Sequence, residues 1–159
     1  VPLISKEDEE VINDFALKYN VDFISIPGIR EVEDVHKLRQ ALGDAGSDIM
    51  VLSRIENKAA LRNFEQVLAY SDGIIIARKQ LSLEMEPEKL FVAQKWMIWN
   101  ANLSAKTAVV GSQLLESMIS GSRPARAEIS DISNAVIEGA DCLMLSQETT
   151  TNETPDKVI

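Results

Sequence analysis

Hydrophobic residues gather into five short runs along the chain, and each run closes on a polar or charged cluster. The segments between the runs repeat their apolar residues at the spacing of helices. Near-continuous apolar strands that alternate with helices are typical of a parallel sheet buried on both faces. In such proteins the chemistry gathers at the carboxyl ends of the strands, where these polar clusters fall. The five runs are residues 21–26, 49–53, 73–77, 108–112 and 142–146.

The intervening segments carry signals for where helices begin and end. Ser5, with Asp8 three residues later, resembles a capping box at the start of a first helix. Gly43 is a stop signal for a second helix over residues 31–42. The apolar face of the first helix would consist of Val11, Ile12, Phe15 and Tyr19. Three more helices are expected over residues 58–70, from Pro87 onward, and from residues 122–124 to Gly139.

Composition and charge narrow the class of protein. With 45% hydrophobic and 26% charged residues, the chain has the makeup of an ordinary soluble globular protein. No apolar stretch approaches the roughly 18 residues of a membrane span, and the start does not resemble a signal peptide. A net charge of −9 excludes a broad electrostatic footprint for nucleic acid or anionic lipid. We therefore expect a cytoplasmic protein with neither nucleic acid nor membrane as a partner.

Cysteine usage adds one expectation about packing. Cys142 is the only cysteine, so an internal disulfide is impossible. Because it stands inside an apolar run, we expect it to be a buried packing residue.

Repeated strand–helix units predict the architecture. Five such units do not close an eight-stranded barrel, so the pattern fits either a partial TIM-type (β/α)8 barrel or a five-stranded doubly wound sheet. The first helix has no strand before it, and the last segment, from Pro155, is short. These features favour a barrel segment that continues beyond both ends. No Gly/Ser-rich or Pro-rich linker interrupts residues 1–159, which predicts one domain-like block.

Five longer motifs follow one another in a single order along the chain. They are VLSRIEN at 51–57, SDGIIIAR at 71–78, QLLESM at 113–118, RPARAE at 123–128 and GADCLMLS at 139–146. Together they resemble the pyruvate kinase family over essentially the whole chain. The resemblance implies that residues 1–159 form the second half of that family's catalytic barrel, roughly its last five strands and their helices. The rest of the barrel and the other domains would lie outside this chain.

The resemblance also implies a reaction. Pyruvate kinases transfer the phosphoryl group of phosphoenolpyruvate to ADP in glycolysis, use Mg²⁺ and K⁺, and finish by protonating enolpyruvate. We therefore expect phosphoenolpyruvate and ADP/ATP as ligands, and a homo-oligomer that includes the remainder of the protein. A phosphoryl group in transfer spreads negative charge over its oxygens, so its site needs positioned cations and hydrogen-bond donors.

Three strand ends retain side chains of the family's site. Glu56 matches the first magnesium carboxylate. Ser112 stands where the family usually has threonine, and it keeps the hydroxyl group. Ser146 matches the serine of a Ser-Gly-Glu-Thr motif in which Gln147 replaces the glycine. The resemblance thus assigns Ser112 and Ser146 to catalysis, Ser112 also to substrate binding, and Glu56 to the metal.

Three other positions are altered. Arg54 occupies the position of the catalytic lysine, and a planar guanidinium does not replace a compact ammonium in phosphoryl transfer. The next loop reads Ala-Arg-Gly-Asp-Leu-Gly in the family, and here Lys79 and Gln80 replace its glycine and aspartate. Gln80 can coordinate magnesium through its amide oxygen but adds no negative charge, so metal affinity should fall. Arg54, Lys79 and Gln80 remain the expected substrate-binding positions, with Arg54 also catalytic and Gln80 also a metal ligand.

Two functional hypotheses follow. The first is a pyruvate kinase-type phosphotransferase whose activity is impaired by these substitutions. The second is a non-catalytic paralogue that keeps the barrel and acts as a binding or assembly component. Under either hypothesis the isolated 159-residue chain is expected to be inactive. Glu128, Arg123 and Arg126 are expected to cap a helix and form ion pairs, and His36 to lie on the surface.

Overall fold

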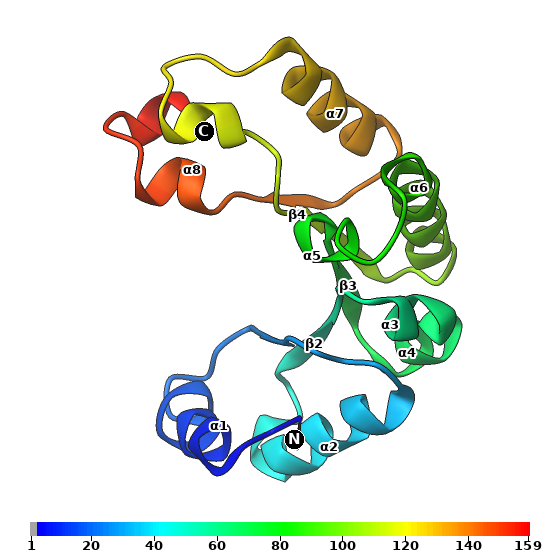
Figure 1. Cartoon of the computed structure of the whole chain (residues 1–159). Coiled ribbons are helices and arrows are strands. Elements are labelled where there is room, and N and C mark those ends of the chain that lie inside the picture. The colour runs from blue at the N-terminus through cyan, green and yellow to red at the C-terminus, as the bar shows by residue number, and fades with distance from the viewer. Residues whose placement is uncertain (1–2) are drawn as a thin grey trace. The chain divides into compact units, whose positions relative to one another are not determined.

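The computed structural model describes residues 3–159. Their contacts divide the chain into two compact units, Val1–Ile75 and Ile76–Ile159, and each unit is described by itself below. The strands follow chain order in the sheet, β1-β2-β3-β4-β5 (Figure 1). The strand β3, Gly73–Ala77, includes the boundary between the units and is buried along its length. The alternation of strands and helices confirms the α/β class.

The first unit begins its sheet with two parallel strands. β1 spans Phe23–Ile26 and β2 spans Met50–Ile55, with Phe23 opposite Met50 and Ile26 opposite Ser53. The helix α2, Val32–Leu42, packs against α4, which in turn contacts β2. The remaining helices of this unit are α1 (Lys6–Val11), the π-helix η1 (Ile12–Leu17), η2 (Asp44–Gly46), α3 (Lys58–Arg62) and α4 (Phe64–Tyr70).

The first helix starts as expected and then departs from the expected face. Ser5 and Asp8 form the capping box, with the Asp8 amide donating to Ser5 Oγ at 3.1 Å. From Ile12 the chain continues as a π-helix, which adds residues to each turn and rotates the apolar stripe. Ile12 and Ala16 are buried, whereas Val11, Phe15 and Tyr19 are exposed. The predicted apolar face is therefore wrong for three of its four members.

The helix expected over residues 58–70 is two helices. α3 ends at Arg62, α4 begins at Phe64, and Asn63 between them departs from helical geometry with φ −97° and ψ 16°. The Asn63 side-chain nitrogen Nδ2 donates to the Arg30 carbonyl, 33 residues earlier in the chain, at 2.9 Å. Phe64, directly after the break, is fully buried.

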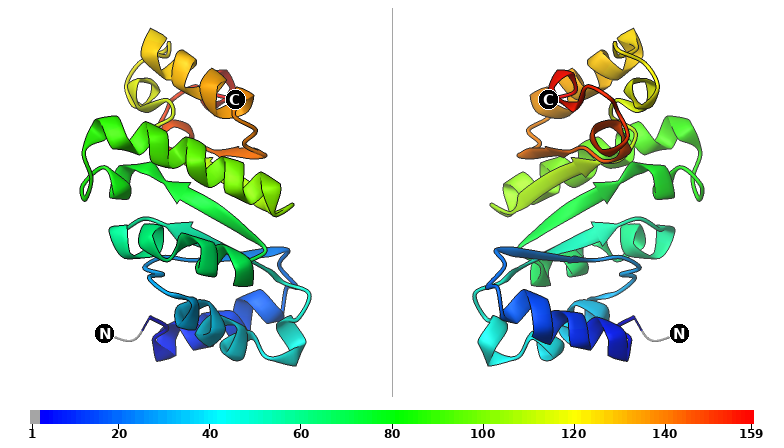
Figure 2. Two further views of the ribbon diagram at one scale, coloured as in Figure 1. Left: turned by 90° about the vertical axis from the view of Figure 1, so that its right-hand side faces the viewer. Right: turned by 90° about the vertical axis from the view of Figure 1, so that its left-hand side faces the viewer.

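The second unit covers the end of β3 and the last two strands. β4 spans Thr107–Gly111 and pairs in parallel with β5, Cys142–Met144, with Val109 opposite Cys142. The helix α6, Pro87–Leu103, lies along β4 (Figure 2). Its residues Met97 and Ile98 are fully buried. The other elements are α5 (Arg78–Leu81), η3 (Glu116–Ile119), α7 (Arg126–Ile137), α8 (Gln147–Thr150) and η4 (Pro155–Lys157).

Cys142 is exposed, so the expectation that it is a buried packing residue is wrong. It belongs to β5, the last strand in the sheet order, whose residues are exposed or half-buried along its length. In the described residues β5 pairs with β4, whereas β3, in which every residue is buried, has a strand on each side. Within residues 3–159, no helix is both long enough and apolar enough to cross a membrane.

Two aspartates pin the strands at their amino ends. Asp72, just before β3, donates its amide to the Val51 carbonyl at 2.9 Å and accepts from the Val51 amide at 2.7 Å. Asp141, just before β5, makes the same reciprocal pair with Ala108, at 2.9 and 2.8 Å. Each aspartate thus extends the ladder by one rung and fixes its register.

We predict that Asp141→Ala lowers the free energy of unfolding by about 1 kcal/mol, the usual net value of one hydrogen bond. The Ala108 amide would lose its acceptor at the start of β4. Urea denaturation followed by circular dichroism measures the change. Asp156→Ala, at an exposed residue of η4, is the matched control and should change little. Equal losses in the two variants would contradict the register role.

Candidate functional site

The predicted site residues lie near the carboxyl end of a strand or just after it, and they fall in both units. Arg54 and Glu56 belong to the first unit and are in contact with each other. Lys79 and Gln80 follow β3 in the second unit. Ser112 follows β4, and Ser146 follows β5 after a single residue. The second unit therefore contributes side chains from three successive strand ends.

Both oxygens of the Glu56 carboxylate have partners. Oε1 accepts from the Gly28 amide at 2.7 Å, and Oε2 lies 2.9 Å from Arg54 Nε. Gly28 has φ +79°, a conformation that side chains disfavour, so glycine at this turn lets the amide face Glu56. The carboxylate also borders a cavity of about 480 Å³, together with Arg30 and Lys37.

Arg54 forms an ion pair with Glu56, but its Nε–H group makes no hydrogen bond. The pair is a close ion pair by distance, with side chains 27% and 16% exposed. Nε is nevertheless a buried nitrogen without a hydrogen bond, because its N–H does not point at the oxygen. The guanidinium therefore neutralises the carboxylate while keeping donor capacity.

The two altered residues after β3 differ in their surroundings. Lys79 is exposed, and its ammonium lies 4.0 Å from Glu116 Oε1, a loose surface pair. Gln80 Oε1 is buried and accepts no hydrogen bond. An acceptor left in that state costs on the order of 1–3 kcal/mol, which makes this oxygen a candidate ligand atom.

Ser112 lies in an unusual turn. Ser112 has φ 67° and Gln113 has φ 54°, so two consecutive residues other than glycine adopt the left-handed conformation. Such residues cost on the order of 1–3 kcal/mol each and persist where surrounding contacts enforce them. Both carbonyls accept from Arg78: Nε donates to Ser112 O at 3.0 Å, and Nη2 donates to Gln113 O. Arg78 is the last residue of the SDGIIIAR motif, and the sequence alone predicted no role for it.

Ser146 is exposed and precedes the short helix α8. Its carbonyl accepts from the Thr149 amide at 3.1 Å and from the Thr149 hydroxyl at 2.8 Å. Two residues later, Glu148 is only 3% exposed and its Oε1 has no hydrogen-bond partner. The buried carboxylate was not expected, because sequence alone does not show which residue of a short helix turns inward.

The oxygen ligands fit a magnesium ion poorly. Among the described residues no group of three or more His, Cys, Asp or Glu side chains could hold a metal. The first unit offers Glu56, which Arg54 already neutralises, and the second offers the uncharged Gln80 Oε1. Magnesium favours carboxylate oxygens, so these residues predict weak binding.

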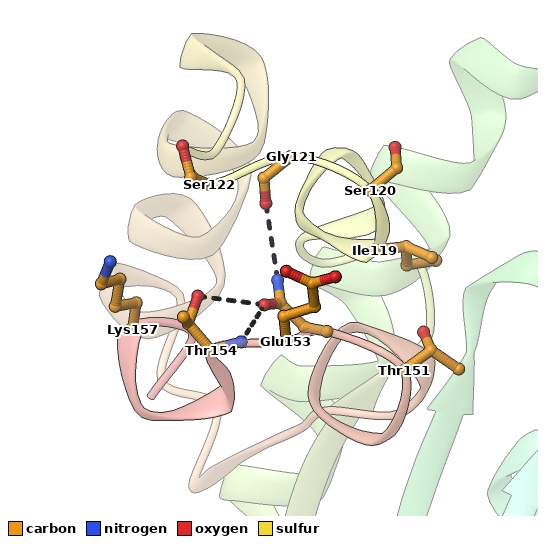
Figure 3. Close-up of a pocket in the computed structure, with 9 residues that line it drawn as sticks. Ile119, Ser120, Gly121, Ser122, Thr151, Glu153, Thr154 and Lys157 are labelled. Atoms are coloured by element: carbon orange, nitrogen blue, oxygen red, sulfur yellow. Dashed lines mark hydrogen bonds between the residues drawn. The ribbon is translucent and has the colours of Figure 1, made fainter.

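A separate hollow of about 370 Å³ lies near the end of the chain (Figure 3). Segments 119–122 and 151–154 line it, together with Lys157. Asn152 ties the two segments together: its Nδ2 donates to Gly121 O at 3.4 Å, and its Oδ1 accepts from the Thr154 amide at 2.6 Å. None of the predicted site residues is among the described lining residues, so this hollow is not part of the predicted site.

Glu128 caps α7, as the sequence predicts. Its carboxylate accepts from the Ser117 and Ala125 amides, each at 2.8 Å, and from the Ser117 hydroxyl. Burial by itself raises the pKa of Glu128, but the hydrogen bonds from Ser117 and Ala125 together hold that pKa below its ordinary value. His36 is exposed, as predicted, and packs edge-on against Tyr70.

Comparisons with known proteins agree with one another. The sequence profile described as "Pyruvate kinase, barrel domain" matches residues 1–159. The chain is 43% identical to pyruvate kinase of Dictyostelium discoideum and 42% identical to human pyruvate kinase PKLR, in each case over its whole length. It covers 31% and 28% of those proteins, or about a third of their length. A crystal structure of a pyruvate kinase from Cryptosporidium parvum matches 99% of the chain with TM-score 0.95 and 44% identity, and the chain covers 33% of it.

We predict that Glu128→Gln removes a pH-dependent part of the stability. The pKa of Glu128 is lowered by folding, so its stabilisation is complete above the ordinary value of 4.5 and is lost as the pH falls below it. Urea midpoints measured from neutral pH down through that value should therefore differ between the two proteins at neutral pH and converge in acid. Glu153→Gln, at an exposed residue, is the control. A constant difference at every pH would contradict the prediction.

Proposed function

Because the chain belongs to the pyruvate kinase family, we propose that the whole protein transfers the phosphoryl group of phosphoenolpyruvate to ADP, at a reduced rate. The observation that carries the reduced rate is the contact of Arg54 Nε with Glu56 Oε2 at 2.9 Å. This contact pairs Arg54, which replaces the family's lysine, with Glu56, the carboxylate that the family also has. A cation held by a protein carboxylate stabilises a transferring phosphoryl group less than one aimed at that group.

The chemistry proposed is that of the family. The bond between phosphorus and the enol oxygen breaks, an oxygen of ADP forms the new bond to phosphorus, and the enolate is then protonated at carbon. The protein's part is to position donors against the negative charge of the transferring group. Arg54 and the Ser112 hydroxyl are the candidate donors, and Arg54 brings a wide planar fork in place of a compact ammonium.

Changes in the loop after β3 support the same proposal. Gln80 presents a neutral oxygen where the family has a carboxylate, and Lys79 adds an exposed ammonium where the family has glycine. Removing one transition-state interaction commonly costs about 2–4 kcal/mol of barrier. The three changes need not add, because residues that act as a unit are not additive.

The proposal extends to the setting of the reaction. We propose Mg²⁺ at low affinity and K⁺ as the cations, a homo-oligomeric assembly, and a role in cytoplasmic glycolysis. The family resemblance supports each of these. The weak cation affinity rests on the pairing of Glu56 with Arg54 and on the uncharged Gln80.

We predict that the combined reversion Arg54→Lys, Lys79→Gly and Gln80→Asp raises magnesium-dependent pyruvate formation by the whole protein. The expected gain is roughly 30-fold or more, equivalent to about 2 kcal/mol or more of barrier. Steady-state assays over a range of Mg²⁺ concentrations measure it, and the half-saturating Mg²⁺ concentration should fall. Lys95→Gly, at an exposed residue of α6, is the control for removing a lysine.

Two outcomes would contradict this proposal. Wild-type turnover typical of kinases would show that the substitutions are compatible with full activity. A reverted protein that folds normally yet forms no pyruvate would show that these positions do not limit catalysis. It would favour the alternative, a non-catalytic paralogue that acts as a binding or assembly component.

We further predict that the isolated 159-residue chain forms no pyruvate at any Mg²⁺ concentration. It spans about a third of the length of its relatives, so most of a family member's residues are absent from it. The same coupled assay applies, with the whole protein as the reference. Turnover by the isolated chain above that of a heat-denatured sample would refute the prediction.

A further inference from the structure

The turn after β4 is held in a conformation that its own residues disfavour. Ser112 and Gln113 both have positive φ, and neither is glycine. A left-handed residue with a Cβ atom persists only where its surroundings enforce it. The contact that enforces this conformation matters for function, because Ser112 carries one of the hydroxyl groups proposed to contact the substrate.

Arg78 supplies the enforcing contact. Its Nε and Nη2 donate to the carbonyls of Ser112 and Gln113, and its Nη1 forms an ion pair with Asp131. Nη1 also lies 3.4 Å from the side-chain oxygen of Gln94. Each of the three guanidinium nitrogens thus has a partner. The side chain is only 6% exposed. The planar fork donates to two neighbouring carbonyls from two separate nitrogens held in a fixed geometry, which the single nitrogen of a lysine ammonium does not provide.

These contacts anchor the turn to several elements. Arg78 is the first residue of α5, directly after β3, Gln94 lies on α6 and Asp131 on α7. The peptide bonds are trans, so fixing the two carbonyls aims the amides of Gln113 and Leu114 away from Arg78. It also fixes the Cα–Cβ bond of Ser112, from which the hydroxyl projects.

We propose that Arg78 is a positioning residue, which locks the left-handed turn so that Ser112 presents its hydroxyl to the phosphoryl-bearing substrate. Arg78 acts through the two carbonyls and does not itself touch the substrate. This inference rests on the proposed function for the identity of the substrate. The locking of the turn rests on the contacts of Arg78 alone.

A residue with the same chemistry elsewhere provides the control. Arg39 donates to the Ile49 carbonyl at 3.1 Å and forms an ion pair with Asp72, at the amino ends of the strands. Arg39→Lys thus removes a comparable guanidinium clamp remote in sequence from the turn. A purely stabilising role for Arg78 would make the two lysine variants behave alike.

The test compares Arg78→Lys and Arg39→Lys in the whole protein. For Arg78→Lys we expect amide hydrogen exchange at residues 112–115 to speed up about tenfold or more. We also expect the KM for phosphoenolpyruvate to rise about tenfold, with the KM for ADP unchanged. Arg39→Lys should lower the melting temperature without either effect. If Arg78→Lys does not fold, Asp131→Asn loosens the same guanidinium, and changes of about threefold in the same direction are expected.

Several results would overturn the inference. Unchanged exchange and an unchanged KM in a folded Arg78→Lys protein would remove the locking role. Equal KM changes in both lysine variants would show general loosening instead of positioning. A wild-type protein that binds no phosphoenolpyruvate would overturn the proposed function and the substrate part of this inference, while exchange at residues 112–115 would still decide whether Arg78 locks the turn.

Discussion

Parallel pairing of the strands is the constraint on which the rest of this structure depends. Parallel neighbours cannot be joined by a tight turn, so the chain returns through a crossover and each new strand starts from the same edge. Asp72 and Asp141 secure that starting edge through reciprocal bonds with Val51 and Ala108. The register is thereby fixed at the amino ends of the strands. The carboxyl ends can vary in sequence while the register is kept, as expected for a barrel fold.

The cations at the carboxyl ends are unequally available to a substrate. Lys79 is exposed and 4.0 Å from Glu116, and a surface pair of this kind is worth about 0–1 kcal/mol, so a phosphate could displace it. Arg54 is closer to Glu56 and less exposed, so moving it would leave a half-buried carboxylate without its counter-charge. Arg78 uses its guanidinium nitrogens to bind the carbonyls of the turn after β4 and the carboxylate of Asp131. Arg54 is therefore harder for a substrate anion to recruit than Lys79.

Much of the fold could be predicted from sequence because parallel strands carry a local signal. All five apolar runs contain strands, and the Ser5 capping box forms as expected. The failures involve contacts between distant residues. Asn63, at the break between α3 and α4, bonds to the Arg30 carbonyl, and Cys142 lies on β5, which is paired with β4 on one side in the described residues. Family motifs named the site residues, but no sequence signal predicted that Ser112 and Gln113 would be left-handed or that Arg78 would hold them.

The substitutions in the loop after β3 change its charge in one direction. Lys79 adds a positive charge where the family has glycine, and Gln80 removes the negative charge of the family's aspartate. The loop thus becomes more attractive to a phosphate anion and less attractive to a divalent cation. The buried, unpaired Gln80 oxygen fits this account, because the position keeps an acceptor but loses its charge. The loop after β3 is therefore expected to bind a metal ion more weakly than a substrate anion.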